Sequence, residues 1–167
     1  TQDHKGVVGV DETRKICLLK IENVTDLQPV AFVAPDQLRV GQWAITMGVG
    51  YGGDDPAVSL GIVSALNRAA GRAVQTDANI SPANYGGPLL DIQGNVLGIC
   101  VPLNPRVKGT GAGSEWYDSG IGFAVSLHGL DHIIKRMAAG ETLKAGLLGV
   151  VPSPKPTDGG VELHQIA

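Results

Sequence analysis

Short apolar segments separated by glycine-rich turns run along most of this chain, and they narrow its possible folds more than any other feature. Glycine supplies 24 of the 167 residues and proline another 10. Several apolar segments have a period of two, as in Ala57–Leu66, where Val58, Leu60 and Ile62 alternate with other residues. Short strands at regular spacing, bounded by turn residues, predict an all-β antiparallel barrel or sandwich.

The individual elements follow from the same patterns. The expected strands are Val7–Val10, Ile16–Ile21, Gln28–Val33, Gly41–Gly48, Ala57–Leu66, Ala73–Asp77, Leu89–Ile92, Val96–Val101, Gly120–Val125, Leu147–Val151 and Gly160–Ile166. One convincing helix is expected at Ser126–Ala139, where apolar residues recur at helical spacing. Ser126 is placed to cap its N-terminus, and Gly140 is placed to end it in the left-handed conformation.

The charge balance argues against several classes of function. The formal net charge is -3, and only 17% of the residues are charged against 43% that are hydrophobic. Disorder requires the opposite composition, and a mildly acidic chain without a basic block does not predict nucleic-acid binding. No membrane span is expected, because no run of 18 apolar residues occurs. The chain starts at Thr1 without a signal-peptide pattern, so any targeting segment is expected to lie outside it.

Cysteine and histidine offer little support for a metal site or a cofactor. Cys17 and Cys100 lie in apolar surroundings and are expected to be buried free thiols, and two cysteines give no disulfide framework. His128 and His132 are four residues apart on the predicted helix, a spacing that can chelate a metal. A metal-binding structural protein is therefore one hypothesis, and a solvated helix face is the other interpretation. No cofactor is expected.

The segment Thr76–Leu89 carries the strongest motif. It reads TDANISPANYGGPL and resembles the nucleophile loop of trypsin-like serine proteases, most closely that of the bacterial Deg/HtrA family. Arg39–Gly48, Ser59–Leu66 and Gly120–Val125 resemble strands of that family in the same order. The four separated motifs agree in their order along the chain, and the resemblance covers roughly Val7–Val150.

This resemblance implies a trypsin-like double antiparallel β-barrel whose first barrel is incomplete in this chain. Residues 1–139 would form that domain, with a complete barrel at about 38–125 and the helix at 126–139. Residues 140–167 would be a linker and the first part of a PDZ domain, which binds peptides by adding a strand to a sheet edge. The peptide-binding entry to that domain would be Leu147, Leu148, Gly149 and Val150.

The catalytic positions of the family are substituted here. A serine protease needs a serine nucleophile, an imidazole base and a carboxylate that orients the imidazole. Tyr85 stands at the serine position, and a phenol, whose ordinary pKa is about 10, is a poor acyl-transfer nucleophile without a base. Lys15 stands at the aspartate position, and the histidine segment would precede Thr1. We therefore expect a degenerate triad with no intact catalytic residue.

The resemblance also places the surroundings of the catalytic loop. Backbone amides near the nucleophile stabilise the oxyanion in such enzymes. Here that loop consists of Ala83, Asn84 and Tyr85, with Ala83 in place of a glycine. The wall of the pocket for a substrate side chain is expected at Asn79, which lies at its base, and at Ile121, Gly122 and Phe123.

Two functions remain open besides the metal hypothesis. The favoured one is a catalytically inactive Deg/HtrA-like protein that acts as a peptide- or protein-binding scaffold. The alternative is a serine-type endopeptidase of protein quality control whose missing elements come from elsewhere. The resemblance further implies a polypeptide partner, either a homo-oligomer such as a trimer or a second chain completing the first barrel, and an extracytoplasmic location in a bacterial periplasm or cell envelope.

Overall fold

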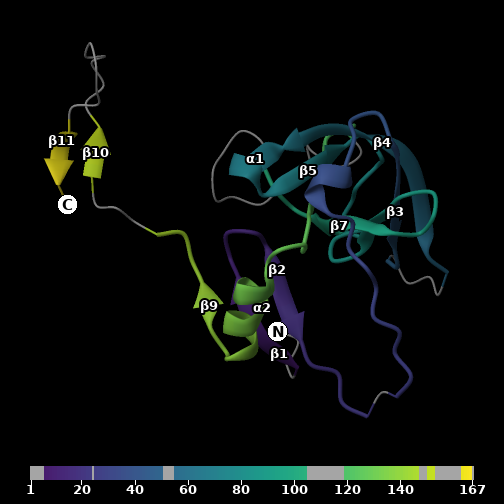
Figure 1. Cartoon of the computed structure of the whole chain (residues 1–167), viewed down its shortest axis with the longest axis horizontal. Helices are drawn as coiled ribbons and strands as arrows, with labels where there is room; N and C mark the ends of the chain where they lie inside the picture. Colours follow the sequence, from purple (N-terminus) through teal and green to yellow (C-terminus); the bar gives the residue numbers. More distant parts are fainter. Residues whose placement is uncertain are drawn as a thin grey trace.

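A closed barrel of six strands forms the largest unit of the computed structural model (Figure 1). The structure describes residues 6–23, 25–50, 55–104, 119–146, 150–152 and 163–166. The barrel strands, in their order of pairing, are β3 (Trp43–Gly48), β4 (Ala57–Asn67), β5 (Ala73–Thr76), β8 (Gly122–Val125), β7 (Val96–Val101) and β6 (Pro88–Leu90). All neighbours are antiparallel, and β6 closes the barrel against β3. The predicted all-β class and antiparallel barrel are confirmed.

Burial alternates along β3, whereas most residues of β7 and β8 are buried. Along β3, Ala44 and Thr46 are fully buried, and the side chains between them face outward, as the two-residue period of a strand requires. The core is completed by fully buried residues of four other strands, namely Val63, Leu89, Leu97, Cys100 and Ala124. Burial of a large apolar side chain stabilises the fold by about 1.5–3 kcal/mol.

A second sheet of three strands lies beside the barrel. Its order is β2 (Ile16–Leu19), β1 (Val7–Asp11) and β9 (Thr142–Leu143), with β1 antiparallel to β2 and parallel to β9. The first two predicted strands therefore form a hairpin. Ile16 packs both against barrel residues and against the buried face of the C-terminal helix, so β2 connects the two units.

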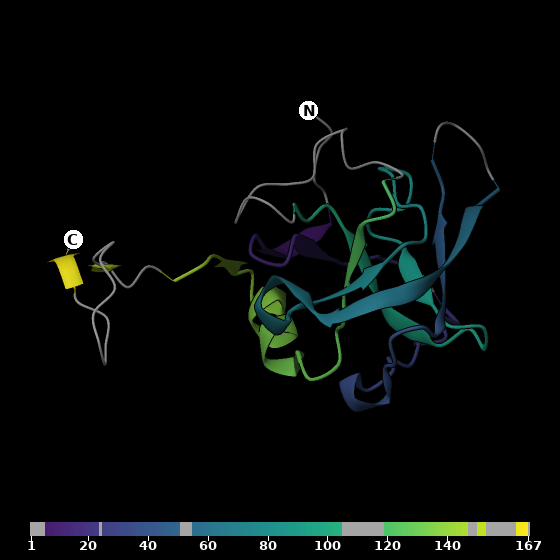
Figure 2. The same cartoon turned by 90° about the horizontal axis from the view of Figure 1, so that it is seen from above.

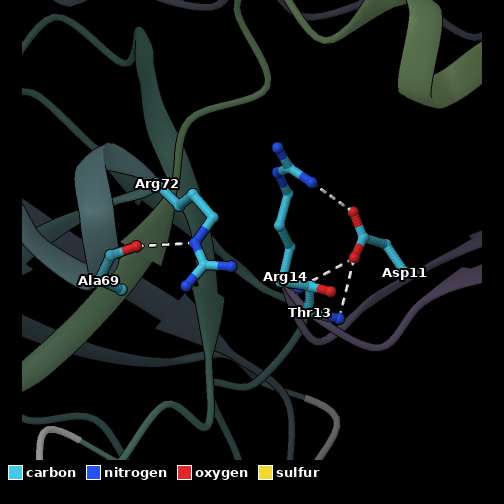
Figure 3. A network of polar contacts seen from close by, with 5 residues as sticks. All are labelled: Asp11, Thr13, Arg14, Ala69 and Arg72. Atoms are coloured by element: carbon cyan, nitrogen blue, oxygen red, sulfur yellow. Dashed lines mark hydrogen bonds and ion pairs between the residues drawn. The ribbon is translucent and has the colours of Figure 1, made fainter. Parts of the chain in front are cut away.

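The carboxylate of Asp11 organises the turn between β1 and β2 (Figure 3). Its Oδ1 accepts hydrogen bonds from the backbone N–H groups of Thr13 at 2.9 Å and Arg14 at 3.0 Å, and its Oδ2 pairs with Nη1 of Arg14 at 2.7 Å. Asp11 is 0% exposed, and a buried charge is tolerated only when it is paired and hydrogen-bonded. Lys15 ends the turn in the left-handed region, with φ 59°.

The C-terminal helix is shorter than the sequence predicts. α2 spans Asp131–Ala138 rather than 126–139, and Leu130, not Ser126, occupies its N-cap position without a side-chain hydrogen bond. The reason is Gly129, whose φ of +74° cannot belong to a right-handed helix. Gly140 follows the helix with φ +89°, in the left-handed conformation predicted for it.

α2 packs onto β1 through a close approach at Gly9. A Cβ atom at Gly9 would collide with the backbone of Met137, so no larger residue fits there without separating the helix from the strand. Met137 and Ile133 are the buried residues of the helix. Leu143 of β9 completes their cluster, so the helix, β1 and β9 share one small core.

Two connections differ from the expected pattern. The strand predicted at Gln28–Val33 is absent, and this segment forms only an isolated parallel bridge between Phe32 and Val96. A short 3-10 helix, Pro35–Gln37, follows it. The connection after β4 contains the single turn α1 (Arg68–Gly71), where Nε of Arg72 donates to the carbonyl of Ala69 at 2.7 Å (Figure 3).

The last described strands pair only with each other. β10 (Val150–Pro152) and β11 (Leu163–Ile166) are antiparallel, and both views show them apart from the barrel and the three-stranded sheet (Figures 1 and 2). Of the expected PDZ entry, Val150 begins β10, whereas Leu147, Leu148 and Gly149 lie outside the described residues. The division at residue 140 therefore stays a prediction.

The two cysteines differ in burial. Cys100 is fully buried, and this burial raises the pKa of its thiol to about 12. Cys17 is exposed, so its expected burial is wrong: it lies on the outward side of the half-covered strand β2. Among the described residues, no helix has the length and hydropathy needed to cross a membrane.

Candidate functional site

The loop between β5 and β6 contains the predicted nucleophile position, and Asn84 fixes its shape. The Asn84 side chain is buried, and its Oδ1 accepts hydrogen bonds from N–H and Oγ of Ser81 at 3.0 and 3.2 Å. Backbone bonds from Asn84 N–H to the Ser81 carbonyl and from Gly87 N–H to the Asn84 carbonyl, both 2.9 Å, close two consecutive turns. The loop is thus held by its own sequence.

The loop is also fixed against the barrel through glycines. A Cβ atom at Gly48, the last residue of β3, would collide with the carbonyl of Ala83, and one at Gly87 would collide with the carbonyl of Met47. The N–H of Gly86 donates to the carbonyl of Cys100 in β7, and the N–H of Cys100 donates to the carbonyl of Gly87, both at 2.9 Å. The backbone of the loop therefore sits directly on β3 and β7, which leaves its side chains to form the surface of the site.

Tyr85 lies at the end of the first turn of this loop. Its N–H points back into the turn, toward the carbonyl of Pro82 at 3.4 Å. Its side chain is half-buried and packs against the barrel core. An oxyanion-binding amide must instead point toward the reacting carbonyl of a substrate, so the Tyr85 amide is not arranged for that role.

A small hollow lies next to Tyr85, and three of the four residues predicted for the pocket wall line it. Ile121, Gly122 and Phe123, at the start of β8, line it together with Tyr85. Ile80 lines it from the same loop as Tyr85, and Val101 and Leu103 line it from the end of β7. The hollow has a volume of about 10 Å³, about the room that one water molecule needs.

Asn79, which the sequence places at the base of a pocket, is not among the described residues that line this hollow. Its side chain is exposed. Its N–H donates to Oγ of Ser59 at 3.0 Å, and its carbonyl accepts a hydrogen bond from Oγ1 of Thr46 at 3.2 Å. These bonds tie the Asn79 backbone to β4 and β3, and the next residue, Ile80, is buried and lines the hollow.

Sequence reasoning missed three lining residues, Ile80, Val101 and Leu103. Ile80 follows Asn79 in the Thr76–Leu89 motif, and the prediction considered only the polar residue of this pair. Val101 and Leu103 flank Pro102. A proline after an apolar strand indicates the end of that strand, and β7 does end at Val101. An apolar residue next to a strand-ending proline was the available clue.

The other predicted site residues lie on different elements. Lys15 is half-buried at the end of the β1–β2 turn and forms no ion pair with the described residues. His132 is in the first turn of α2, whereas His128 precedes the helix, so the two histidines do not share a helical face as predicted. Among the described residues, no group of three His, Cys, Asp or Glu side chains could hold a metal ion.

Comparison of this sequence with models of known protein families gives one match. The trypsin-like peptidase domain matches residues 1–99, which is more than half of the chain. The chain belongs to the trypsin-like peptidase family. The resemblance stated from the sequence motifs is thereby confirmed at the level of the family.

Members of the trypsin-like peptidase family named as Deg or HtrA proteases are among its relatives. A putative serine protease HhoA of Synechocystis is 38% identical over 86% of this chain and 36% of its own length. The periplasmic pH-dependent serine endoprotease DegQ of Escherichia coli is 35% identical over 86% of this chain and 31% of its own length. The chain thus spans about a third of these relatives.

A solved structure of the same group supports the fold. The HtrA-type protease AlgW with a tripeptide superposes with a TM-score of 0.73 at 26% identity, over 97% of this chain and 56% of that chain. The structure of Deg5 gives a TM-score of 0.61 at 29% identity, over 81% of this chain and 62% of that chain. The trypsin-like barrel is therefore shared with HtrA-type proteases.

Proposed function

We propose that this member of the trypsin-like peptidase family holds extended polypeptide without cleaving it. Tyr85, at the position of the family's nucleophilic serine, carries this proposal. A phenol is a weak acyl-transfer nucleophile unless a neighbouring base removes its proton.

The backbone of the loop supports the same conclusion. Removal of a single oxyanion-hole donor lowers turnover by about 10²–10³-fold in a serine protease. Here the Tyr85 amide lies 3.4 Å from the carbonyl of Pro82, which directs it away from a substrate. Ala83, which replaces a glycine, has its carbonyl packed against Gly48. A loop fixed in this way favours binding over acyl transfer.

Lys15, in the turn between β1 and β2, also supports binding without cleavage. By the family pattern this position orients the catalytic imidazole with a carboxylate, which also stabilises the imidazolium during the reaction. A lysine cation would oppose that charge. The only fully buried carboxylate among the described residues, Asp11, is already used by Arg14 and the β1–β2 turn, so it does not replace the missing group.

Peptidase assays on the full-length protein test the proposal. We expect no turnover of a chromogenic peptide or of unfolded casein, together with measurable binding of a fluorescent extended peptide by anisotropy. Tyr85→Ser alone is expected to leave turnover absent, because it restores neither a base nor an oxyanion amide. Turnover by the wild type that disappears in Tyr85→Ala would show that the chain is an enzyme.

A serine endopeptidase is the second candidate, favoured by the names of the relatives. HhoA and DegQ are both described as serine proteases. The missing groups would then be supplied by other parts of the protein or by another chain. A fluorophosphonate probe, which labels activated serine hydroxyls, separates the candidates: covalent labelling of the full-length protein supports the enzyme, and its absence supports the binding protein.

The partner is proposed to be a polypeptide, and a further copy or a second chain is proposed to complete the assembly. β2 is an edge strand of its sheet, with Leu19 58% exposed and Ile21, just after it, 68% exposed. An apolar edge of this kind is suited to a further strand. By family resemblance we also propose an extracytoplasmic location and a peptide-binding role for the segment beginning at Leu147.

A further inference from the structure

Two arginines lie at the junction between the three-stranded sheet and the barrel. Ile16, at the start of β2, packs against the apolar cluster that contains Ala73, the first residue of β5. Arg14 precedes Ile16 by two residues, and Arg72 directly precedes Ala73, so each arginine comes from a different side of this junction. Figure 3 shows both side chains in one close view, with a nitrogen of the Arg72 guanidinium turned toward Arg14.

Arg14 is held in place by a buried carboxylate. Its Nη1 lies 2.7 Å from Oδ2 of Asp11, and the Arg14 side chain is only 20% exposed. The other carboxylate oxygen of Asp11 accepts two backbone hydrogen bonds within the same turn. In the part of the chain that the structure describes, the Arg14 guanidinium donates to no acceptor besides Asp11. Its remaining N–H groups are therefore available to a ligand.

Arg72 is positioned by the strained turn α1. Its Nε donates to the carbonyl of Ala69 at 2.7 Å, and Ala69 itself has a left-handed φ of 50°. Arg72 is half-buried, yet the ion pairs of the described residues involve only the cations Arg14, Arg136 and Lys144. A partly buried charge without a partner of opposite charge is costly. A bound anion would reduce that cost.

Positive charge is in excess at this junction, although the chain as a whole has a net charge of -3. Lys15, beside Arg14 in sequence, is also half-buried and forms no ion pair within the described residues. Of the two carboxylates in the β1–β2 turn, Asp11 is used by Arg14, and Glu12 pairs with Lys144 at 3.7 Å. Two cations are thus left without a carboxylate, and an anion bound between the arginines would be attracted by all three.

We propose that this junction is a binding site for a tetrahedral oxyanion, phosphate or a phosphate monoester, held between Arg14 and Arg72. A guanidinium presents its N–H groups in a planar fork that suits phosphate oxygens. A tetrahedral anion has oxygens on several sides and can accept from both arginines, whereas a planar carboxylate is satisfied by one. The anion would tie the sheet to the barrel. The site goes beyond the proposed function, because neither arginine lines the hollow beside Tyr85.

Isothermal titration calorimetry on the full-length protein tests the site. The probes are inorganic phosphate, O-phosphoserine and, as a planar comparison, acetate, with sodium chloride holding the ionic strength constant because salt screens exposed charges. We expect at least one phosphate probe to bind at least about tenfold more tightly than acetate. Binding of inorganic phosphate supports a free ion as the ligand, and binding of O-phosphoserine alone supports a phosphate carried by a partner molecule. No binding of either probe, or equal binding of acetate, would overturn the proposal.

Arg72→Gln is the deciding variant, because it removes one guanidinium and leaves the pair of Arg14 with Asp11 intact. We expect it to weaken phosphate binding at least about tenfold, since it removes charge-assisted hydrogen bonds. Arg39→Gln is the matched control: Arg39 also donates to backbone carbonyls, those of Asp36 and Leu38, and its loss removes the same charge. An unchanged affinity in Arg72→Gln, or an equal loss in Arg39→Gln, would show that Arg72 does not hold the anion.

Arg72→Lys separates the shape of the guanidinium from its charge. It keeps the cation but not the planar fork, so its affinity for phosphate should be lower than that of the wild type. It also replaces Arg72→Gln as the test if circular dichroism shows that the glutamine variant is unfolded. Phosphate should raise the thermal midpoint of the wild type at constant ionic strength, because a ligand that binds only the folded state stabilises it. A rise of the same size in Arg72→Lys and in Arg72→Gln would place the anion elsewhere.

Discussion

At the scale of single residues, burial decides which groups are chemically available. Cys100 and Cys17 are both free thiols with apolar neighbours in sequence, yet one is sealed in the barrel and the other faces outward from β2. Only the thiolate form reacts with alkylating or disulfide reagents. At Cys100, burial both covers the thiol and raises its pKa, so the two effects act in the same direction.

The first prediction concerns these thiols. Burial raises the pKa of Cys100 to about 12, so at pH 8 it is almost wholly protonated as well as covered. We expect a disulfide reagent such as DTNB to modify one thiol rapidly in the native protein and two in denaturant. Cys17→Ser should remove the rapid reaction, and Cys100→Ser should keep it. Two rapid native thiols would contradict the barrel core.

A second prediction at this scale compares two apolar residues on either side of one turn. Leu89 of β6 is 0% exposed, whereas Ile92, just after β6, is 60% exposed. Leu89→Ala should lower the free energy of unfolding by about 2–5 kcal/mol, because it leaves a cavity. Ile92→Ala, the matched control, should change it by less than about 0.5 kcal/mol. Urea unfolding measures both, and equal effects would refute the assigned interior.

At the scale of elements, the turn between β6 and β7 depends on one carboxylate. Asp91 accepts hydrogen bonds from the N–H of Gln93 at 2.8 Å and from the N–H and side-chain amide of Asn95 at 2.9 and 2.8 Å. Burial raises the pKa of Asp91, but the hydrogen bonds from Asn95, Gln93 and Gly94 together hold it below its ordinary value. The charged form is thus the one that the turn stabilises.

The sign of the pH dependence follows from this lowered pKa. Ionised Asp91 contributes stability above its ordinary pKa of about 4, and this contribution disappears as the pH falls through the lower folded-state value. Asp91→Asn should therefore destabilise the protein at pH 7 and by much less at pH 3, measured by urea unfolding. Asp36→Asn, at an exposed position before β3, should show no such convergence. A constant difference for Asp91→Asn would contradict the charged turn.

The connection after β4 is the most strained element that the structure describes. Ala69 and Ala70 have φ of 50° and 58°, and Gly71 has φ +80°. Left-handed alanine costs about 1–2 kcal/mol per residue, a penalty that glycine does not pay. Ala70→Gly should therefore raise the free energy of unfolding by about 0.5–1 kcal/mol in chemical denaturation. Ala138→Gly, in the right-handed helix α2, should lower it, and a loss in both variants would disprove the strained turn.

Local patterns predicted most elements because strand period and turn residues act over a few neighbours. The predictions of secondary structure fail where contacts between residues distant in sequence determine the conformation. Gly129 delays the start of the helix to Asp131, although the apolar stripe begins at Leu127. Gln28–Val33 has strand composition, but its one bridge among the described residues is that of Phe32 with Val96. At the site, the motif indicates the loop between β5 and β6, whereas the burial of Ile80 beside the exposed Asn79 depends on hydrogen bonds to β3 and β4 that no local pattern contains.

At the scale of the whole molecule, the barrel presents an apolar outer face. Outward residues of β3 and β4 pair across the strands, Trp43 with Ile62, Ile45 with Leu60 and Met47 with Val58. Three of these side chains are largely exposed, Trp43 at 53%, Leu60 at 58% and Val58 at 61%. Contiguous apolar surface on a folded domain commonly marks a contact with another protein.

The homo-oligomer proposed for this chain should therefore use the outer face of β3 and β4. Sedimentation of the full-length protein should show self-association, and Trp43→Ser combined with Leu60→Ser should raise its dissociation constant at least about tenfold, because two exposed anchors lose their burial. Both positions lie outside the barrel core, so circular dichroism and the unfolding midpoint should change little. Val30→Ser, with 62% exposure in the connection before β3, is the matched control and should leave association unchanged. If the double variant associates as strongly as the wild type, the contact lies elsewhere, and the exposed edge of β2 becomes the surface to which the second copy must bind.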